Sequence, residues 1–248
     1  MDVDDLAPLS ARSVMLSLLL GSHPDRMSAA ELVRAGEHFG IPPATARVAL
    51  TRAVAAGDLE RAQGDPRQYV LGDRLTARQR RQDEAVLDAE TRWDGTWEMA
   101  VVVVAGRTGA ERATLRDRLS SYRLAELREG VWTRPANLRR PRGYAAEAVL
   151  ATFTTTPDDD PADLASRLWD LAGWADRGRL LLDGLERTTA PAPRLAVAAQ
   201  LVRHLATDPL LPAALLPADW PAAAMRTAYA GYQDELRELA FGSPARTS

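Results

Sequence analysis

The chain contains neither cysteine nor lysine, and it has only three histidines among its 248 residues. Without cysteine it can form no disulfide, no thiol nucleophile and no thiolate metal site, which fits a reducing compartment. The histidines, His23, His38 and His204, lie far apart in the sequence and form no ligand-spaced pair. We therefore expect no metal site made by the protein's own side chains.

Long hydrophobic runs are also missing. The two longest, residues 14–20 and 99–105, are too short to cross a bilayer, and the first residues are acidic where a signal peptide would be basic. We expect a soluble, cytoplasmic protein with no membrane partner. The length leaves room for one large domain or two to three small ones.

Positive charge is concentrated near the N-terminus, although the net charge of the chain is −3. Between residues 10 and 82, eleven arginines stand against seven acidic residues, a local excess of four positive charges. Such a patch in an acidic chain is typical of a single DNA-binding module. Because the chain has no lysine, every basic contact would be made by the forked guanidinium group of an arginine. The heavy use of Ala, Arg, Leu and Asp throughout the chain indicates, however, that the preference for arginine over lysine reflects overall composition.

The N-terminal part is organised around residues 41–69. Pro42 and Pro43 suit the entrance of a helix, and Gly57 suits its C-terminal cap. One side of this helix carries apolar residues at helical spacing: Ala46, Ala49, Leu50, Ala53 and Val54.

The other side of the same helix is a ridge of small residues between two arginines. Small side chains let a backbone approach DNA, Val and Thr methyls suit thymine, and Arg suits phosphate or guanine. A packing helix with a solvated arginine face is the alternative. The candidate DNA contacts, together with one residue of the following turn, are Thr45, Arg47, Val48, Thr51, Arg52 and Arg67.

Two short strands, at residues 58–62 and 67–71, are expected after this helix, joined by Gly64-Asp65-Pro66. Before it we expect a helix at residues 11–21 and another that opens at the capping-box pattern Ser28-Ala-Ala-Glu31 and runs to residue 39. Three helices followed by a hairpin predict a winged helix-turn-helix domain over residues 10–76. A polar linker helix is predicted at residues 77–92, where Arg78, Arg80 and Arg81 either contact the DNA backbone or form a solvated face.

A ferredoxin-like α+β domain is predicted for residues 93–156. It would begin with the tight turn Trp93-Asp-Gly-Thr-Trp97 and a valine-rich strand at residues 98–105, buried on both faces. A charged helix at residues 107–122 with Leu115 and Leu119 inward, a strand at 130–135 and an apolar segment at 148–155 would follow.

A helical domain is predicted for residues 157–240, with helices at 164–174, 194–205 and 225–239. The acidic run at residues 158–163 resembles a metal ligand set. We interpret it instead as a helix start, with Asp160 as the N-cap and Pro161 as the first helical residue, because no other carboxylates converge at ligand spacing. Residues 208–221 form an apolar loop punctuated by prolines.

Three motifs in this order resemble the PaaX family of phenylacetate-pathway transcriptional repressors. They are the 93–97 turn before a valine strand, Gly130-Val-Trp-Thr-Arg-Pro135, and the proline-punctuated loop at 208–221. The resemblance spans residues 10–235 and implies an α+β multidomain protein with a winged helix, a ferredoxin-like middle and a helical C-terminal region. It alone implies a repressor and a CoA thioester ligand.

The family's recognition-helix pattern, Val-Arg-x-Ala-Leu-x-Arg-Leu, corresponds here to residues 46–53. Arg47 and Arg52 carry over, whereas Ala53 is smaller than the usual leucine. The family's wing tends to be more basic, and Asp65 beside a phosphate would repel it. No equally clear motif fixes an effector pocket. The residues that could hold a pyrophosphate and stack an adenine, or else form a polar surface loop, are Trp132, Arg134, Asn137, Arg139 and Arg140.

Three functions remain open from the sequence. The first is a homodimeric repressor that binds palindromic double-stranded operator DNA and is released by a small-molecule effector such as an acyl-CoA. The second is a metal-dependent nuclease, because the middle domain resembles small CRISPR-associated nucleases. Those enzymes hold Mg²⁺ with an aspartate at the end of the first strand. Here that strand ends Val104-Ala105-Gly106, and Asp94 stands at its beginning instead. The third is a regulator controlled by a protein partner alone. No Ser-His-Asp, Cys-His or Gly-rich phosphate-loop pattern is present, so no catalytic residue and no cofactor are predicted.

Overall fold

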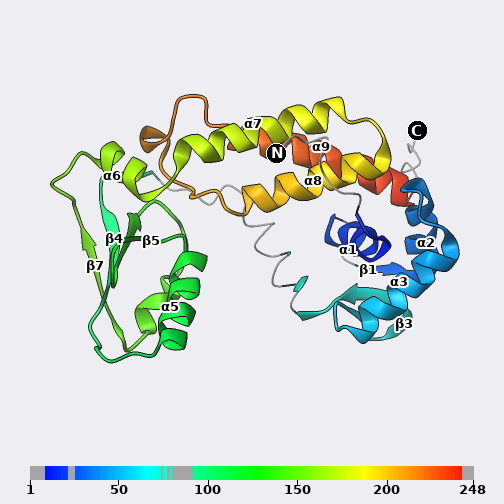
Figure 1. The fold of residues 1–248 in the computed structure, drawn as a ribbon, viewed down its shortest axis with the longest axis horizontal. Helices are drawn as coiled ribbons and strands as arrows, with labels where there is room; N and C mark the ends of the chain where they lie inside the picture. Colours follow the sequence, from blue (N-terminus) through cyan, green and yellow to red (C-terminus); the bar gives the residue numbers. More distant parts are fainter. Residues whose placement is uncertain (1–8, 22–25, 74, 77–78, 80–91, 242–248) are drawn as a thin grey trace. The chain divides into compact units, whose positions relative to one another are not determined.

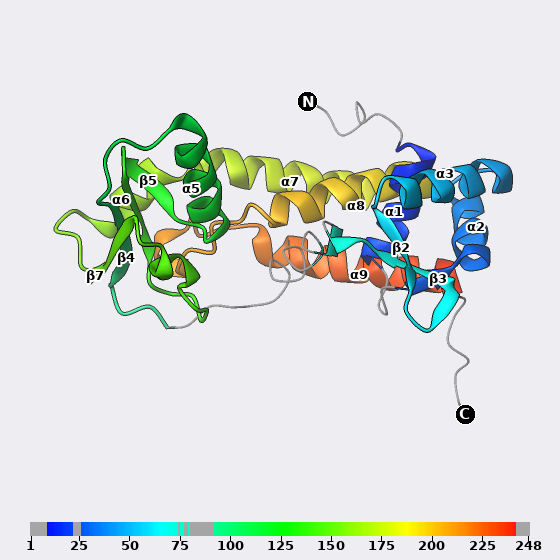
Figure 2. The same cartoon turned by 90° about the horizontal axis from the view of Figure 1, so that it is seen from below.

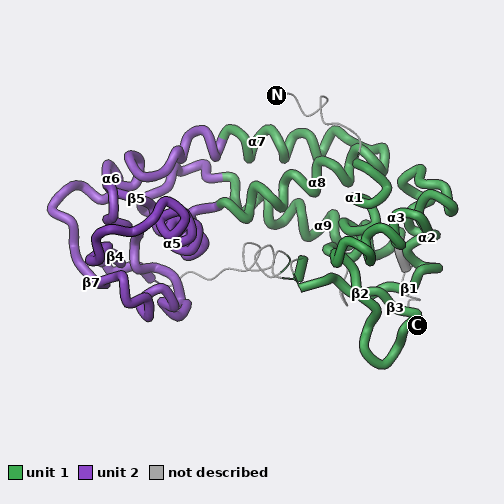
Figure 3. The backbone as a smooth tube through the Cα atoms, turned by 60° about the horizontal axis from the view of Figure 1, so that its bottom comes forward, with its two compact units in different colours: residues 1–87, 176–207, 221–248 green, residues 88–175, 208–220 purple. Residues whose placement is uncertain are grey.

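The computed structural model of the chain describes residues 9–21, 26–73, 75, 76, 79 and 92–241. The described part is mixed α/β with two small antiparallel sheets, and the chain divides into two compact units (Figure 3). Unit 1 comprises residues 1–87, 176–207 and 221–248, and unit 2 comprises residues 88–175 and 208–220. Nearly all of the predicted linker helix, including Arg78, Arg80 and Arg81, lies outside the described residues. The division into three domains stays a prediction.

The N-terminal part of unit 1 contains three helices and a three-stranded sheet (Figure 1). The helices are α1 (Ala11–Gly21), α2 (Ala29–His38) and α3 (Pro43–Ala55), at the positions predicted. The strands are β1 (Arg26–Ser28), β2 (Leu59–Ala62) and β3 (Asp65–Leu71), in the order β1-β3-β2. The sequence did not predict β1. Its last residue, Ser28, also caps α2, because its side chain accepts a hydrogen bond from the Glu31 amide at 3.2 Å.

The hairpin turn lies one residue earlier than predicted. Ala62 pairs with Asp65, so the turn is Gln63-Gly64, and Asp65 and Pro66 already belong to β3. Gly64 has φ +85°, which a two-residue hairpin turn requires and glycine adopts without strain. The pairing of β2 with β3 changes register between Arg61 and Ala62, just before this turn.

The helices of the C-terminal part differ in extent from those predicted: one is interrupted, and the last two are longer. Helix α6 (Pro161–Leu168) ends where the extended Trp169 interrupts the helix predicted at 164–174. The Asp170 side chain accepts from the Gly173 amide at 2.9 Å, which starts a new helix, α7 (Leu171–Arg187), that crosses the unit boundary. It is followed by α8 (Pro191–Leu205) and α9 (Ala222–Phe241).

Helices α8 and α9 lie side by side in unit 1 and contact α1, and α9 also contacts α2 (Figures 1 and 2). Arg194 of α8 pairs with Glu235 of α9 at 2.8 Å. A Cβ atom placed on Gly21 of α1 would lie 2.9 Å from the side chain of Leu236, so glycine allows the close approach of α1 and α9. The C-terminal helices therefore share a core with the N-terminal ones.

Unit 2 is built on a four-stranded antiparallel sheet in the order β5-β6-β4-β7. The strands are β4 (Trp97–Val102), β5 (Ala125–Arg128), β6 (Val131–Pro135) and β7 (Leu150–Thr155). With α5 (Gly109–Ser121) after β4, the order and directions are those of a ferredoxin-like βαββαβ unit, except that the 3₁₀ turn η2 (Gly143–Ala146) replaces the second helix. The short β5 was not predicted.

The two faces of this sheet are covered by different segments. On one face α5 and η2 close a core that includes Ala100, Leu119, Trp132 and Tyr144. Near Trp97, α6 and the segment containing η3 (Ala213–Leu215) form a second core, to which Leu164, Leu171, Leu211 and Leu215 contribute.

The prediction of a valine strand buried on both faces is wrong at its end. Val103 and Val104 are 59% and 45% exposed. Strand β4 pairs with β7 as far as Val102, opposite Leu150, and after one further bond, from the Val103 amide to the Val149 carbonyl at 3.0 Å, the chain leaves the sheet. No helix in the described part of the chain is long and apolar enough to cross a membrane.

Candidate nucleic-acid interface

Helix α3 buries one side and exposes the other. Ala46, Ala49, Leu50 and Ala53 are at most 6% exposed, as their spacing predicted. Val54, which was assigned to the same stripe, is 36% exposed, so the prediction is wrong at this position. The small buried residues let α3 pack closely against α1 and α2.

The C-terminal end of α3 is held by backbone bonds and one ion pair. Gly57 has φ +70°, and the next amide, of Asp58, donates to the Ala53 carbonyl at 2.9 Å, which satisfies carbonyls at the helix end. The Asp58 side chain is buried and pairs with Arg12 of α1. The Asp58 carbonyl accepts from Gly72 at 2.8 Å, just beyond β3. These contacts fix α3 relative to α1 and the hairpin.

The predicted contact residues of α3 all lie on its exposed side. They are Thr45, Arg47, Val48, Thr51 and Arg52, and Val48 is 51% exposed. The Thr51 hydroxyl donates to the Arg47 carbonyl at 3.0 Å, so its hydrogen-bonding capacity is partly used within the helix. Within the described part of the chain, the guanidinium groups of Arg47 and Arg52 have no hydrogen-bond or ion-pair partner. The guanidinium groups of Arg47 and Arg52 are therefore available for binding on either side of the exposed Val48.

The β2–β3 hairpin presents a further cation. Arg67 is exposed, and its backbone amide donates to the Asp65 carboxylate at 3.0 Å. Arg61 stiffens the hairpin, because it donates to the Pro66 carbonyl at 2.9 Å and its guanidinium lies 4.1 Å from the centre of the Tyr69 ring. The hairpin tip thus carries one positive and one negative side chain.

Unit 2 contains the residues that the sequence suggested for an effector, and most of them are internal. Arg134 is fully buried, and it donates to the Asn137 side chain at 2.9 Å and to the Leu210 carbonyl at 3.0 Å. Asn137, also buried, donates to the same carbonyl at 3.0 Å. Burial lowers the pKa of the Arg134 guanidinium to about 9, with a smaller effect from the neighbouring Arg140. These two side chains hold the segment at Leu210 against the sheet.

Arg140 belongs to a second part of the same cluster. It donates to the Tyr122 carbonyl at 2.8 Å and lies 3.3 Å from the buried Glu98 carboxylate, which also accepts from the Tyr144 hydroxyl at 2.5 Å. Burial and this hydrogen bond raise the pKa of Tyr144 above its ordinary value. Sequence spacing did not reveal Glu98 or Tyr144, because the cluster joins three separate segments.

The two remaining candidates differ in exposure. Arg139 is exposed, whereas Trp132 is only 5% exposed and lines a pocket in unit 2. Contact of an effector with any of these five side chains stays a prediction.

Among the described residues, no group of three or more His, Asp or Glu side chains could hold a metal ion. Asp94 lies in the turn before β4, where its carboxylate accepts from the Thr96 amide at 3.0 Å.

Three family models match successive parts of the chain. The model described as PaaX-like protein matches residues 10–75, the PaaX protein central Cas2-like domain matches 90–157, and the PaaX-like protein C-terminal domain matches 175–242. The chain belongs to the PaaX family. The resemblance drawn from the three sequence motifs is thereby confirmed.

PaaX-family proteins are DNA-binding transcriptional regulators of phenylacetic acid catabolism rather than enzymes. The chain is similar to a solved structure, the uncharacterized protein Rv0674 from Mycobacterium tuberculosis, with 47% sequence identity and a TM-score of 0.79. The match covers 93% of this chain and 97% of that one. No protein of curated function matches the chain. Family membership therefore gives DNA as a partner but names neither the operator nor the effector.

Proposed function

We propose that this PaaX-family chain is a repressor whose helix α3 reads the major groove of operator DNA as part of a winged helix-turn-helix. The observation that carries the proposal is the division of α3 into a buried alanine- and leucine-lined side and an exposed side with Arg47 and Arg52. A recognition helix needs both sides, one to fix its position and one to meet base edges.

The exposed side suits the two kinds of contact that a major groove offers. The Val48 side chain can pack against thymine methyl groups, and the Thr51 methyl group can do the same while its hydroxyl bonds to the helix backbone. Arg47 and Arg52, which have no partner in the described part of the chain, can bind phosphate or the O6 and N7 acceptors of guanine. Thr45 would contact the backbone near the start of the helix.

The β2–β3 hairpin acts as the wing. Arg67 would reach a phosphate beside the groove, and the Arg61–Tyr69 contact keeps the hairpin rigid. Asp65, two residues before Arg67, opposes that contact electrostatically. In this proposal α3 supplies most of the affinity, and the wing adds little.

The effector in this proposal is an acyl-CoA, and the protein acts as a homodimer on a palindromic site. Family resemblance supports the effector class. An effector that binds one state of the dimer more tightly would change the spacing of the two α3 helices and release the operator. Control by a protein partner without any small molecule is the alternative. A panel of acyl-CoAs and free acids in a thermal-shift assay separates the two, because a ligand of the folded state raises the melting temperature.

The DNA proposal is tested by selecting duplexes from a random pool with the full-length chain and footprinting the recovered site. We expect protection at two half-sites whose centres lie about one helical turn, or a multiple of it, apart. The double variant Arg47→Gln/Arg52→Gln, which keeps the length and polarity of the side chains, should recover no enriched sequence. Enrichment of the same site by wild type and by this variant would contradict a role for α3.

A further inference from the structure

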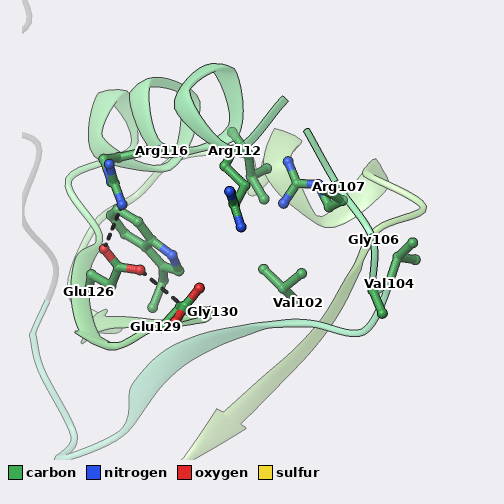
Figure 4. Close-up of a pocket in the computed structure, with 12 residues that line it drawn as sticks. Val102, Val104, Gly106, Arg107, Arg112, Arg116, Glu126, Glu129 and Gly130 are labelled. Atoms are coloured by element: carbon green, nitrogen blue, oxygen red, sulfur yellow. Dashed lines mark hydrogen bonds and ion pairs between the residues drawn. The ribbon is translucent and has the colours of Figure 1, made fainter. Parts of the chain in front are cut away.

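Unit 2 contains a pocket at the end of β4 that the proposed function does not use (Figure 4). Its volume is about 310 Å³. The pocket lies between the end of β4 with the loop after it, the first turns of α5, and the β5–β6 turn. Such a volume is at the lower end of the range of small-molecule sites.

The floor of this pocket is apolar. Val102 of β4, Leu115 of α5 and Trp132 of β6 line it, and the last two belong to the core of unit 2. Because these side chains are fixed by packing, the floor is preformed. Val104, 45% exposed, lines the pocket from the loop after β4. The pocket can therefore receive a hydrocarbon chain or an aromatic ring.

The walls carry charges of both signs, and they are not equally available. Arg116 pairs with Glu126 at 3.5 Å, and Glu126 also accepts from the Gly130 amide at 3.3 Å, so this pair is largely self-neutralised. Arg107 donates to the Glu111 carbonyl at 2.6 Å, which orients it, and its charge also helps to lower the pKa of the Glu111 carboxylate, so it is partly compensated from outside the pocket.

Arg112 is the cation of the pocket wall that is most available to a ligand. In the described part of the chain its guanidinium has no hydrogen-bond or ion-pair partner, and Figure 4 shows it pointing toward the space above Val102. Arg107 approaches from the same side. Glu129, on the β5–β6 turn, is the remaining lining acid. Beyond the Arg116–Glu126 pair, two cations and one anion line the pocket, an excess of one positive charge.

We propose that this pocket binds a small organic monocarboxylate, with the carboxylate on Arg112 and Arg107 and the apolar body on Val102, Leu115 and Trp132. A guanidinium fork matches the geometry of a carboxylate, and an excess of one positive charge balances a single negative charge. Glu129 disfavours ligands with several negative charges, such as phosphates and pyrophosphates. The volume is too small to enclose a CoA ester, so the site goes beyond the effector proposed above and does not depend on DNA binding.

Calorimetric titration of the full-length chain without DNA tests this site. The probes are benzoate and hexanoate as monocarboxylates, benzamide as the neutral counterpart of benzoate, and ADP as a multiply charged anion. We expect saturable binding of at least one of the two acids, binding of benzamide weaker than that of benzoate by at least about tenfold, and no saturable binding of ADP. Failure of both acids to bind saturably, or tighter binding of ADP than of either acid, overturns the proposal.

Four variants locate the binding. Arg112→Gln should weaken the binding of the carboxylate about tenfold, the equivalent of one lost charge-assisted contact. Val104→Asp, at an exposed lining position, should weaken it as well by adding a negative charge, whereas Glu129→Gln should strengthen it. Arg128→Gln makes the same change of charge as Arg112→Gln at an exposed position of unit 2 that does not line the pocket, and should leave the affinity unchanged. Equal affinity of wild type and Arg112→Gln contradicts the proposal, and none of these results bears on α3.

Discussion

Arg134 donates a hydrogen bond of 3.0 Å to the carbonyl oxygen of Leu210, 76 residues further along the chain. Leu210 has φ +49°, a conformation that a leucine rarely adopts, and its carbonyl also accepts from Asn137. The segment between α8 and α9 is thus fastened to the sheet of unit 2 by two buried side chains. This contact gives Arg134 and Asn137 a structural role, whatever else they do.

Replacement of this arginine should loosen the segment. Arg134→Met leaves the buried oxygens of Pro135 and Asn137 without their donor, and we expect a loss of about 2–4 kcal/mol in the free energy of unfolding. Amide hydrogen exchange at Leu210 and Leu211 should accelerate. Arg139→Met, at an exposed position nearby, should change stability by less than about 0.5 kcal/mol. Unchanged exchange at Leu210 in the Arg134 variant would contradict this role.

The buried tyrosines predict how stability depends on pH. Burial and the bond to Glu98 raise the pKa of Tyr144, and burial raises the pKa of Tyr232. The folded chain keeps these protons where the unfolded chain releases them, so the free energy of unfolding should fall as the pH rises above about 10. Spectrophotometric titration of phenolate should show late ionisation, and Tyr144→Phe should remove one late group. Complete titration of all tyrosines near pH 10 in the folded protein would contradict the prediction.

Replacing either of two glycines of unit 1 by alanine should change the free energy of unfolding, in opposite directions at the two positions. A Cβ atom on Gly72 would lie 2.2 Å from the Gly57 carbonyl oxygen, a backbone atom that cannot move without disturbing the end of α3. Gly72→Ala should lower the free energy of unfolding by about 1–3 kcal/mol. A Cβ atom on Gly231, inside α9, would meet no atom within 4 Å beyond the adjoining backbone of its own helix. Gly231→Ala should therefore raise the free energy of unfolding by about 0.5–1 kcal/mol. Chemical denaturation measures both, and an equal effect of the two changes would rule out the packing argument.

The wing makes a prediction of its own. Asp65→Asn removes the negative charge beside Arg67 but keeps an oxygen that can accept from the Arg67 amide. If the wing approaches a phosphate, operator affinity should increase about twofold to fivefold, and the increase should shrink at high salt. Fluorescence anisotropy with the selected duplex measures the change. Identical affinity across salt concentrations would place the hairpin away from the DNA.

Local sequence signals predicted the N-terminal elements best. Pro43 and Gly57 bound α3 because each acts through its own backbone, and Ser28 with Glu31 begins α2 in the same way. Asp160 caps α6 as predicted, since its carboxylate accepts from the Ala162 and Asp163 amides. Such signals need no knowledge of distant contacts.

The features that were missed depend on distant contacts. Strand β1 exists because Met27 pairs with Tyr69, and β5 because Ala125 pairs with Thr133, although neither short segment has a strong pattern of its own. Arginine is rarely buried, and no residue near Arg134 in the sequence indicates that its guanidinium is buried and bonded to the Leu210 carbonyl. The valine run predicts a fully buried strand, but the paired register with β7 ends at Val102, opposite Leu150.

The central claim is that α3 lies in the major groove, and the salt dependence of operator binding tests it most directly. Arg52→Ala should lower the affinity for the selected duplex and reduce the slope of log K against log salt by about 0.9, the value for one lost phosphate contact. Arg187→Ala, at an exposed position at the end of α7, should change neither quantity. If Arg52→Ala binds with the affinity and slope of the wild type, α3 is not the element that contacts DNA through this arginine, and the account fails.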